Sequence, residues 1–246
     1  CGSAGDLLQH VNEQDVVTFT GSASTGRMLK STPSITENAV RFNMEADSLN
    51  CSILGPDANP ETEEFKLFIK EVSREMTIKA GQKCTAIRRI IVPENICDDV
   101  IKAVSARLKT NVIGDPAFEG VRMGPLASKE QVGDVQQKIK ELQQTCEIVY
   151  GDINNFEVSG ADKNKGFFMP SILMHSKKPF DKSGAHSIEA FGPVSTIMPY
   201  KTIGDAIELA KMGKGSLVCS IVTADDKIAR DFVIGAACMH GRILVL

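Results

Sequence analysis

The sequence predicts an α/β fold built on a mostly parallel sheet. Short segments rich in β-branched residues alternate with amphipathic helical segments along the whole chain, and no internal repeat is present. The 246 residues are enough to bury a sizeable core without disulfide bonds. We therefore expect one large α/β domain or two unequal ones.

The first part of the chain predicts short strands followed by a long helix. Strands are expected at 15–20 and 43–54, and the turn after the first one opens a helix. A longer helix is expected at 61–80, with acidic residues in its first turn and Gly81 as its stop. Its apolar stripe, at helical spacing, consists of Phe65, Phe68, Val72 and Met76.

The rest of the chain continues this alternation. A strand at 86–92 precedes a loop rich in Gly and Pro at 113–128. Further strands are expected at 166–174, 194–200, 216–222 and 242–246. Helices are expected at 96–108, 132–142, 203–212 and 225–237.

Charge and cysteine content exclude several function classes. The net charge is -3, and Lys and Arg are scattered, which argues against a nucleic-acid surface. No apolar run is long enough to span a membrane and no charged-then-apolar leader is present, so we expect no membrane contact and a cytoplasmic location. The seven cysteines never form C-x-x-C and the four histidines are far apart, so neither a disulfide framework nor a metal site is expected.

The two ends of the chain suggest a piece of a longer protein. The first residues, CGSAGD, lack an initiator Met; Cys1 as the anchor of a lipidated protein is one interpretation, but a patterned segment follows almost at once. The last residues, ILVL, resemble a strand that needs partners. A boundary is expected in the Pro-rich stretch 56–63, which divides the chain into units 1–57 and 58–246.

Cys84 is the first candidate for chemistry. It follows the expected end of a helix, beside Lys83 and close in sequence to Arg88 and Arg89. Nearby cations favour the thiolate, which is the nucleophilic form of cysteine. The alternative interpretation is a buried structural cysteine, which is the more common kind.

The segment FTGSASTGRMLK resembles a phosphate-binding turn. It follows a strand and opens a helix, so backbone N–H groups near Gly21 and hydroxyls of Ser22 and Thr25 can approach a phosphate at the positive helix end. The spacing is not G-x-G-x-x-G. An ordinary capped helix start is the alternative interpretation.

Two carboxylates complete the set of candidates. Glu45 falls within an expected strand, where a carboxylate is unusual unless it has a function; the alternatives are a solvated strand end or an ion pair with Arg41. Glu189 precedes Phe191 by two residues, so both side chains lie on one face of an extended segment before Gly-Pro turns the chain. Such a pair suits a ribose and a flat heterocycle, or else a plain edge-strand pair.

Taken together, these segments resemble the aldehyde dehydrogenase family. FTGS, Glu45, GQKC at Cys84 and E-x-F-G-P at 189–193 occur in the family's order, and the resemblance covers nearly the whole chain. It implies a Rossmann-like, doubly wound fold. The expected unit 1–57 would then be the last part of an NAD(P)-binding domain, and 58–246 a catalytic domain truncated at its C-terminal end.

The resemblance also implies roles for the candidate residues. Cys84 would be the nucleophile and Glu45 the general base that activates the deacylating water. The residues implied at the NADP or NAD cofactor are Gly21, Ser22, Thr25, Ala46, Glu189 and Phe191. Other family groups, a cofactor-binding lysine and an oxyanion-binding asparagine, would precede Cys1, so the chain alone could be inactive.

One departure narrows the resemblance. Where most of the family has Leu-Gly-Gly after its glutamate, this chain reads EADSLN. The segments EADSLN and GQKCTAIRR are similar to the corresponding segments of family members from phenylacetate-type aromatic catabolism. Some of those members are bifunctional proteins in which the dehydrogenase is fused to an enoyl-CoA hydratase. This similarity implies a small-molecule aldehyde as substrate, with a CoA-linked semialdehyde as one candidate, and a homo-oligomer for the full-length protein.

Two other functions remain open from the sequence. One is a cofactor-free cysteine acyltransferase or thioesterase in which a histidine acts as base for Cys84, although no histidine is near it in sequence. The other is a binding or assembly module in which the motifs no longer catalyse a reaction.

Overall fold

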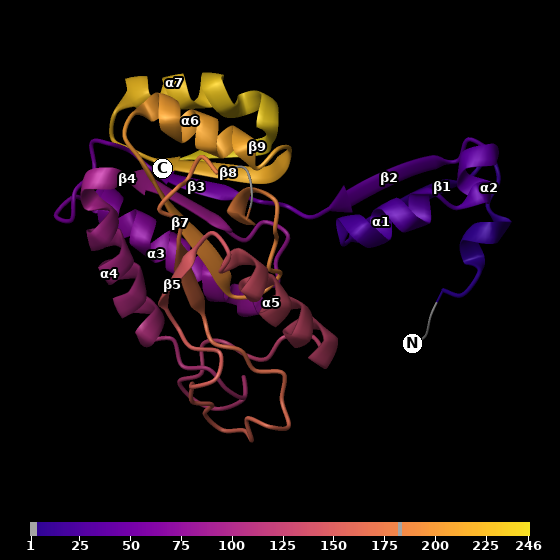
Figure 1. Ribbon diagram of the computed structural model, residues 1–246, viewed down its shortest axis with the longest axis horizontal. Coiled ribbons are helices and arrows are strands. Elements are labelled where there is room, and N and C mark those ends of the chain that lie inside the picture. The colour runs from indigo at the N-terminus through magenta and orange to yellow at the C-terminus, as the bar shows by residue number, and fades with distance from the viewer. Residues whose placement is uncertain (1–3, 182–183) are drawn as a thin grey trace. The chain divides into compact units, whose positions relative to one another are not determined.

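The computed structural model describes residues 4–181 and 184–246 (Figure 1). The chain forms two compact units that divide between Asp47 and Ser48. Each unit has its own sheet, of two strands in the first unit and seven in the second. Cys1 lies outside the described residues.

The first unit is a small α/β layer. Its elements are the 3-10 turn η1 (Leu7–His10), β1 (Val16–Gly21), α1 (Ala23–Lys30), α2 (Pro33–Glu37) and β2 (Arg41–Ala46). β1 and β2 are parallel, with Gly21 opposite Ala46 at their carboxyl ends. Gly26 of α1 is buried against β2, because a Cβ there would lie 2.3 Å from the sulfur of Met44. A larger residue at this position would therefore have to displace the side chain of Met44.

The second unit is built on one large, mostly parallel sheet. Its strands are β3 (Cys51–Leu54), β4 (Arg89–Pro93), β5 (Glu147–Tyr150), β6 (Ile172–His175), β7 (Val194–Tyr200), β8 (Ser216–Val222) and β9 (His240–Val245). Their order in the sheet is β5-β6-β7-β4-β3-β8-β9, and only β5 is antiparallel to its neighbour. The helices are α3 (Glu63–Thr77), α4 (Cys97–Lys109), α5 (Lys129–Leu142), α6 (Ile203–Met212) and α7 (Asp226–Ala236), and the short 3-10 turns are η2 (Ile78–Gly81), η3 (Glu94–Ile96), η4 (Gly184–His186) and η5 (Ala237–Met239).

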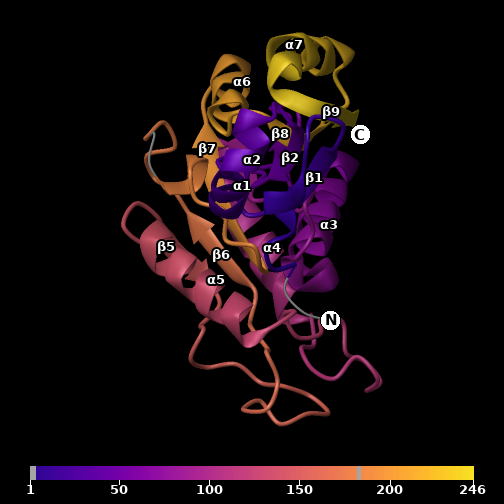
Figure 2. The ribbon, with the colours of Figure 1, turned by 90° about the vertical axis from the view of Figure 1, so that its right-hand side faces the viewer.

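Helices cover both faces of this sheet, which makes the fold doubly wound. Ile90 of β4 packs in the apolar cluster of α3 and α4, whereas its neighbour Ile91 packs in the cluster of α5, α6 and α7. This alternation follows from the period of two along a strand. Figure 2 shows α6 and α7 close together near β8 and β9. The expected Rossmann-like α/β class is confirmed.

The structure differs from the expected elements at several places. The single strand expected at 43–54 is two strands, β2 and β3, in different sheets; the chain turns between them at Asp47, whose φ is +37°. Because β3 pairs with β4 and β8, the units divide before the boundary expected at 57/58. The strand expected at 166–174 begins only at Ile172, and β5 was not expected.

The helix before Cys84 also ends earlier than expected. α3 stops at Thr77, and Lys79 and Ala80 adopt left-handed backbone angles before Gly81, whose φ is +70°. A Cβ on Gly81 would lie 2.2 Å from the carbonyl oxygen of Gly192. Glycine is therefore required here by a tertiary contact as well as by its backbone angle. Across 4–181 and 184–246, no helix has the length and apolar character needed to cross a membrane.

Candidate active site

Four of the expected cofactor residues lie together in the first unit. Gly21 and Ala46 face each other at the carboxyl ends of β1 and β2, and Ser22 and Thr25 begin α1 directly after β1. The crevice at the carboxyl ends of parallel strands is where open α/β sheets bind ligands. The fold thus brings the FTGS turn and the residue after Glu45 to one edge.

Side chains already cap the start of α1. The Ser22 hydroxyl accepts a hydrogen bond from the backbone N–H of Thr25 at 3.2 Å, and Asp47 Oδ1 accepts one from the N–H of Ala23 at 3.0 Å. The turn therefore has a capped helix start, as the alternative interpretation held, and it also presents the exposed hydroxyls of Ser22 and Ser24 beside the half-buried Thr25. Asp47, which caps this helix from the chain after β2, was not among the residues predicted from the sequence.

Glu45 is exposed near the end of β2, opposite Thr20 of β1. Most of β2 is exposed, so the carboxylate of Glu45 stays in contact with solvent and has no cost of burial in this strand. The argument from a buried strand is therefore wrong, and the assignment of Glu45 as a base depends on the family resemblance. Glu45 belongs to the first unit and Cys84 to the second.

Cys84 is exposed on a tight turn before β4. The backbone N–H of Ala86 donates to the carbonyl oxygen of Lys83 at 3.0 Å, which closes the turn. Asn50, fully buried before β3, donates from Nδ2 to the carbonyl oxygens of Cys84 at 2.8 Å and Ala86 at 2.9 Å. The buried Asn50 amide thus fixes the backbone of the turn, while the Cys84 thiol stays accessible. Cys84 is therefore not a buried structural cysteine.

Asn50 is itself fixed by its acceptor atom. Its Oδ1 accepts hydrogen bonds from the hydroxyl of Ser48 at 2.7 Å and from the backbone N–H of Val218 at 3.0 Å. Nδ2 donates and Oδ1 accepts in this network, so the amide orientation is determined by its partners. The sequence reasoning missed Asn50, although a polar residue directly before a buried strand is a usable signal.

Arg88 joins the Cys84 segment to the E-x-F-G-P segment. Its side chain is buried, and its guanidinium donates to Glu189 Oε1 at 3.2 Å, to the carbonyl oxygen of Gly192 at 2.7 Å and to that of Gly81 at 2.8 Å. The same guanidinium lies 5.4 Å from the centre of the Phe191 ring. Burial lowers the pKa of Arg88, and the charge of Glu189 opposes this shift.

The other oxygen of Glu189 also has a partner. Oε2 accepts the backbone N–H of Ser48 at 2.9 Å, so Glu189 bridges Arg88 and the start of the second unit's chain. Gln82 adds a further link: its Oε1 accepts the N–H of Ala127 at 2.8 Å and its Nε2 donates to the carbonyl oxygen of Phe191 at 3.3 Å. Cys84, Glu189 and Phe191 therefore belong to one connected network.

The cations expected to activate Cys84 are used elsewhere. Lys83 pairs with Glu75 at 2.8 Å. Arg89 is fully buried and donates to the carbonyl oxygens of Leu49 at 2.9 Å and Ala210 at 2.9 Å. Three charges close in sequence thus have separate partners, and the cation-stabilised thiolate stays a prediction.

The residues of this network gather at the amino ends of parallel strands. Asn50 precedes β3, the Cys84 turn precedes β4 and the E-x-F-G-P segment precedes β7. β3 and β7 both pair with β4, so the three segments meet at one edge of the sheet. The arrangement can present an accessible thiol on a rigid turn.

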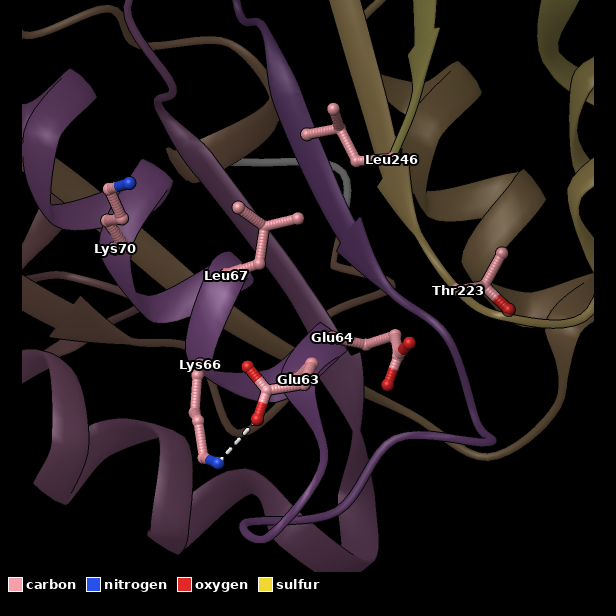
Figure 3. Close-up of a pocket in the computed structure, with 7 residues that line it drawn as sticks. All are labelled: Glu63, Glu64, Lys66, Leu67, Lys70, Thr223 and Leu246. Atoms are coloured by element: carbon pink, nitrogen blue, oxygen red, sulfur yellow. Dashed lines mark hydrogen bonds and ion pairs between the residues drawn. The ribbon is translucent and has the colours of Figure 1, made fainter.

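A pocket in the structure lies away from these residues. Figure 3 shows it beside α3, lined by Glu63, Glu64, Lys66, Leu67, Lys70, Thr223 and Leu246. Lys66 pairs with Glu63 at 2.7 Å, and neither faces a candidate residue. We assign no function to this pocket, because it contains none of the expected site residues.

Comparisons with known proteins agree with this fold and these motifs. The 3,4-dehydroadipyl-CoA semialdehyde dehydrogenase of Aromatoleum evansii is 45% identical over 246 residues, which is 100% of this chain and 48% of that protein. Protein MaoC of Klebsiella aerogenes is 41% identical over 125 residues, 50% of this chain and 36% of that protein. The chain thus spans about half the length, or less, of these curated relatives.

Solved structures give the same fold. A betaine aldehyde dehydrogenase variant from Staphylococcus aureus superposes with a TM-score of 0.85 at 24% identity, over 99% of this chain and 47% of that one. Aldehyde dehydrogenase C from Pseudomonas syringae, crystallised with NAD+ and octanal, gives a TM-score of 0.79 at 25% identity, over 94% and 45%. The family model described as "Aldehyde dehydrogenase family" matches residues 2–238. This chain belongs to the aldehyde dehydrogenase family.

Proposed function

We propose that the protein oxidises an aldehyde to the carboxylic acid with NADP or NAD, using Cys84 as the nucleophile. The observation that carries this proposal is the Cys84 turn, which leaves the thiol exposed while Asn50 and the Arg88 network fix the backbone around it. A nucleophile that is accessible and rigidly supported fits covalent catalysis.

In the proposed reaction, the Cys84 thiolate adds to the aldehyde carbon and forms a C–S bond, and the carbonyl oxygen becomes an oxyanion. The backbone N–H of Cys84 donates to this oxyanion. A bound nicotinamide cofactor supplies the acceptor for the hydride that leaves the same carbon. Collapse of the oxyanion gives a thioester on Cys84.

Glu45 then takes a proton from water, which attacks the thioester carbon and releases the carboxylic acid and the Cys84 thiolate. Splitting the oxidation into acyl transfer and hydrolysis replaces one difficult step by two easier ones. This role of Glu45 rests on the family resemblance and on its place next to Ala46, at the carboxyl end of β2.

The residues at the first unit's edge fit a nucleotide cofactor. The exposed hydroxyl of Ser22 and the half-buried hydroxyl of Thr25 can turn to donate to a phosphate, and Gly21 leaves room for the close approach of one. Glu189 and Phe191 are proposed to contact the nicotinamide ribose and ring. The carboxylate of Asp47 opposes the binding of an anion at this turn. It is itself negatively charged, and it already accepts the hydrogen bond of the first N–H of α1.

This effect of Asp47 gives a test of the cofactor site. Asp47→Asn removes the charge but keeps an acceptor and a residue that tolerates a left-handed backbone. We expect it to tighten the binding of NADPH or NADH several-fold at low salt, with a smaller effect at high salt. Glu13→Gln, an exposed change in the same unit, is the control and should leave the dissociation constant unchanged in a fluorescence titration. Equal constants for both variants would count against a cofactor phosphate at this turn.

The substrate class is proposed from sequence similarity. The EADSLN and GQKCTAIRR phrases and the relative named 3,4-dehydroadipyl-CoA semialdehyde dehydrogenase support a CoA-linked semialdehyde from aromatic catabolism. For the protein at the full length that its gene encodes, we propose a homo-oligomer and a fusion to a hydratase domain.

The direct test measures aldehyde-dependent formation of NADPH or NADH by the protein at the full length that its gene encodes. Cys84→Ser is expected to abolish it, whereas Cys238→Ser, which changes the other exposed cysteine in the described part of the chain, should leave it intact. Cofactor reduction that persists in Cys84→Ser would refute the proposed nucleophile. An intact protein without any aldehyde-dependent reduction would favour the binding-module alternative.

A cofactor-free cysteine hydrolase or acyltransferase is less well supported. Within the described residues, the one cysteine–histidine hydrogen bond joins Cys97 Sγ to His175 Nε2 at 3.8 Å, and His175 Nδ1 lies 3.4 Å from Glu147. However, burial and the charges of Asp98 and Glu94 raise the pKa of Cys97 to about 11. A thiol that stays protonated at neutral pH is a poor nucleophile, so this trio does not replace Cys84.

A further inference from the structure

Two cysteines and a histidine that are far apart in the sequence meet on three neighbouring strands of the second unit. Cys51 of β3 lies directly opposite Cys219 of β8, and their sulfur atoms are 3.5 Å apart. His240 begins β9, opposite Ser216 of β8. One ligand atom from each of the three residues lies within 4.8 Å of the others.

The imidazole of His240 has one nitrogen that is occupied and one that is not. Ser216 Oγ lies 2.6 Å from Nδ1, and the same hydroxyl donates to the carbonyl oxygen of Val218 at 3.4 Å. The Ser216 oxygen can accept the Nδ1–H, and in that tautomer Nε2 carries a lone pair. Nε2 is buried without a hydrogen-bond partner.

Such an orphaned buried nitrogen is unusual in a native structure. Metal-binding histidines commonly show this pattern, because the nitrogen that does not bind the metal is held by a hydrogen bond to a neighbouring oxygen. Ser216 supplies that bond here. The pattern is a second observation, independent of the thiol pair, that points to a ligand.

The two thiols have opposite pKa shifts. The hydrogen bond with Cys219 and the positive charge of Arg89 lower the pKa of Cys51, against the effect of burial, whereas the hydrogen bond with Cys51 and burial raise the pKa of Cys219. Burial and Arg89 lower the pKa of His240 to about 4, so its imidazole is neutral at neutral pH. Arg89, with its donors on carbonyl oxygens, balances the negative charge of the sulfur ligands.

We propose that Cys51, Cys219 and Nε2 of His240 bind a thiophilic divalent cation such as Zn²⁺. Binding forms two metal–sulfur bonds and one metal–nitrogen bond and releases to solvent whatever protons the two thiols carry. At a metal–sulfur bond of about 2.3 Å, a tetrahedral site requires sulfur atoms roughly 3.8 Å apart. The observed 3.5 Å is close to that separation.

The fourth position is left for water. His240 is only half-buried, so the cation can reach the site from the β9 side. The proposed site is separate from Cys84 and independent of the dehydrogenase function. Cys51 and Cys219 belong to the apolar core cluster of the second unit.

The test uses the whole chain, kept reduced with a phosphine, freed of metal with a chelator and titrated with Co²⁺. One equivalent should give the near-ultraviolet bands of cobalt–thiolate bonds and the visible bands of tetrahedral cobalt, and Zn²⁺ should displace both. Cys219→Ser should abolish the thiolate bands. Ser216→Ala, which removes the partner of Nδ1, should weaken binding roughly tenfold.

His240→Gln keeps the proposal testable if the core cysteine variants fail to fold. It changes a half-buried edge residue, and it should weaken Co²⁺ binding by roughly a hundredfold or more while the circular dichroism spectrum stays that of the wild type. Cys84→Ser and Cys97→Ser are the controls. Both should bind Co²⁺ as the wild type does, since neither residue belongs to the trio.

Three results would overturn the proposal. The first is a folded His240→Gln variant that binds Co²⁺ as tightly as the wild type. The second is loss of Co²⁺ binding in Cys84→Ser. The third is a reduced wild-type chain that binds no Co²⁺ but loses two thiols to a Cys51–Cys219 disulfide in air, which would make the pair a redox couple.

Discussion

The side-chain amide of Asn50 donates a hydrogen bond to the carbonyl oxygen of Cys84 at 2.8 Å. This bond links residues 34 positions apart and fixes the turn that carries the proposed nucleophile. The same amide holds Ala86 and accepts from Val218, so one buried side chain joins the Cys84 turn to β8.

Asn50→Ala is therefore expected to be strongly destabilising. It leaves buried carbonyl and N–H groups without partners, at a cost of about 3 kcal/mol in the free energy of unfolding. Chemical denaturation with circular dichroism measures this loss. Asn155→Ala, an exposed change, is the control and should lie within about 0.5 kcal/mol of the wild type; similar values for the two variants would contradict the role of Asn50.

The buried pair Arg88–Glu189 gives a second prediction. Arg88→Met removes the cation and leaves the Glu189 carboxylate buried, which should lower the free energy of unfolding by about 4 kcal/mol. Arg74→Met is a matched control, because Arg74 pairs with Glu71 at the same 3.2 Å on the surface. Its effect should be below about 1 kcal/mol. A small loss in Arg88→Met would mean that the network around Cys84 does not depend on this pair.

Thiol reactivity should follow exposure. Cys84 and Cys238 are exposed, whereas Cys51, Cys97, Cys146 and Cys219 are buried. Burial also raises the pKa of Cys146, as it does that of Cys97. Mass-resolved iodoacetamide labelling of the native chain should modify Cys84 before any buried cysteine. Labelling of Cys97 or Cys146 ahead of Cys84 would show that the turn is not accessible in solution.

Much of the fold was predictable because its signals are local. Alternating β-branched and amphipathic segments predicted the α/β class, and helical spacing predicted α3 to within a few residues at each end. The break at Asp47 was missed, because the segment 43–54 has strand character throughout and only pairing in two different sheets separates β2 from β3. β5 was missed because its four residues are only partly buried or exposed.

The sequence offers candidate site residues, but it does not predict their contacts. Cys84 and Glu189 follow from motifs, whereas the burial of Arg88 and Arg89 depends on partners 100 or more positions away, such as Gly192 and Ala210. The same reason explains the thiol–imidazole cluster. Cys51, Cys219 and His240 show no metal-ligand spacing in the sequence, and only the strand order β3-β8-β9 brings them together.

Acid should destabilise the second unit through its buried histidines. Burial lowers the pKa of His186, and it lowers that of His240 to about 4. In the unfolded chain a histidine has a pKa near 6.5, so below about that pH the unfolded chain binds more protons than the folded one. Stability is therefore full above pH 6.5 and falls as the pH drops towards 4.

Melting temperatures measured at pH 7.5 and pH 5 in the presence of a chelator test this expectation. The wild type should lose more stability between the two values than His240→Gln, which lacks one of the two groups. His10→Gln, an exposed histidine of the first unit, should behave as the wild type does. An equal loss in the wild type and in His240→Gln would contradict the assigned pKa direction.

The central claim, that Cys84 forms a thioester which Glu45 hydrolyses, is tested most directly by Glu45→Gln in the protein at its full encoded length. Excess aldehyde and cofactor are mixed in a stopped-flow instrument, and the quenched protein is weighed by intact mass spectrometry. We predict one burst of reduced cofactor per site, an acyl adduct on Cys84, and steady turnover slowed roughly a hundredfold or more. A Glu45→Gln protein that binds cofactor but shows neither burst nor adduct would contradict the account, because Glu45 would then act before the thioester forms.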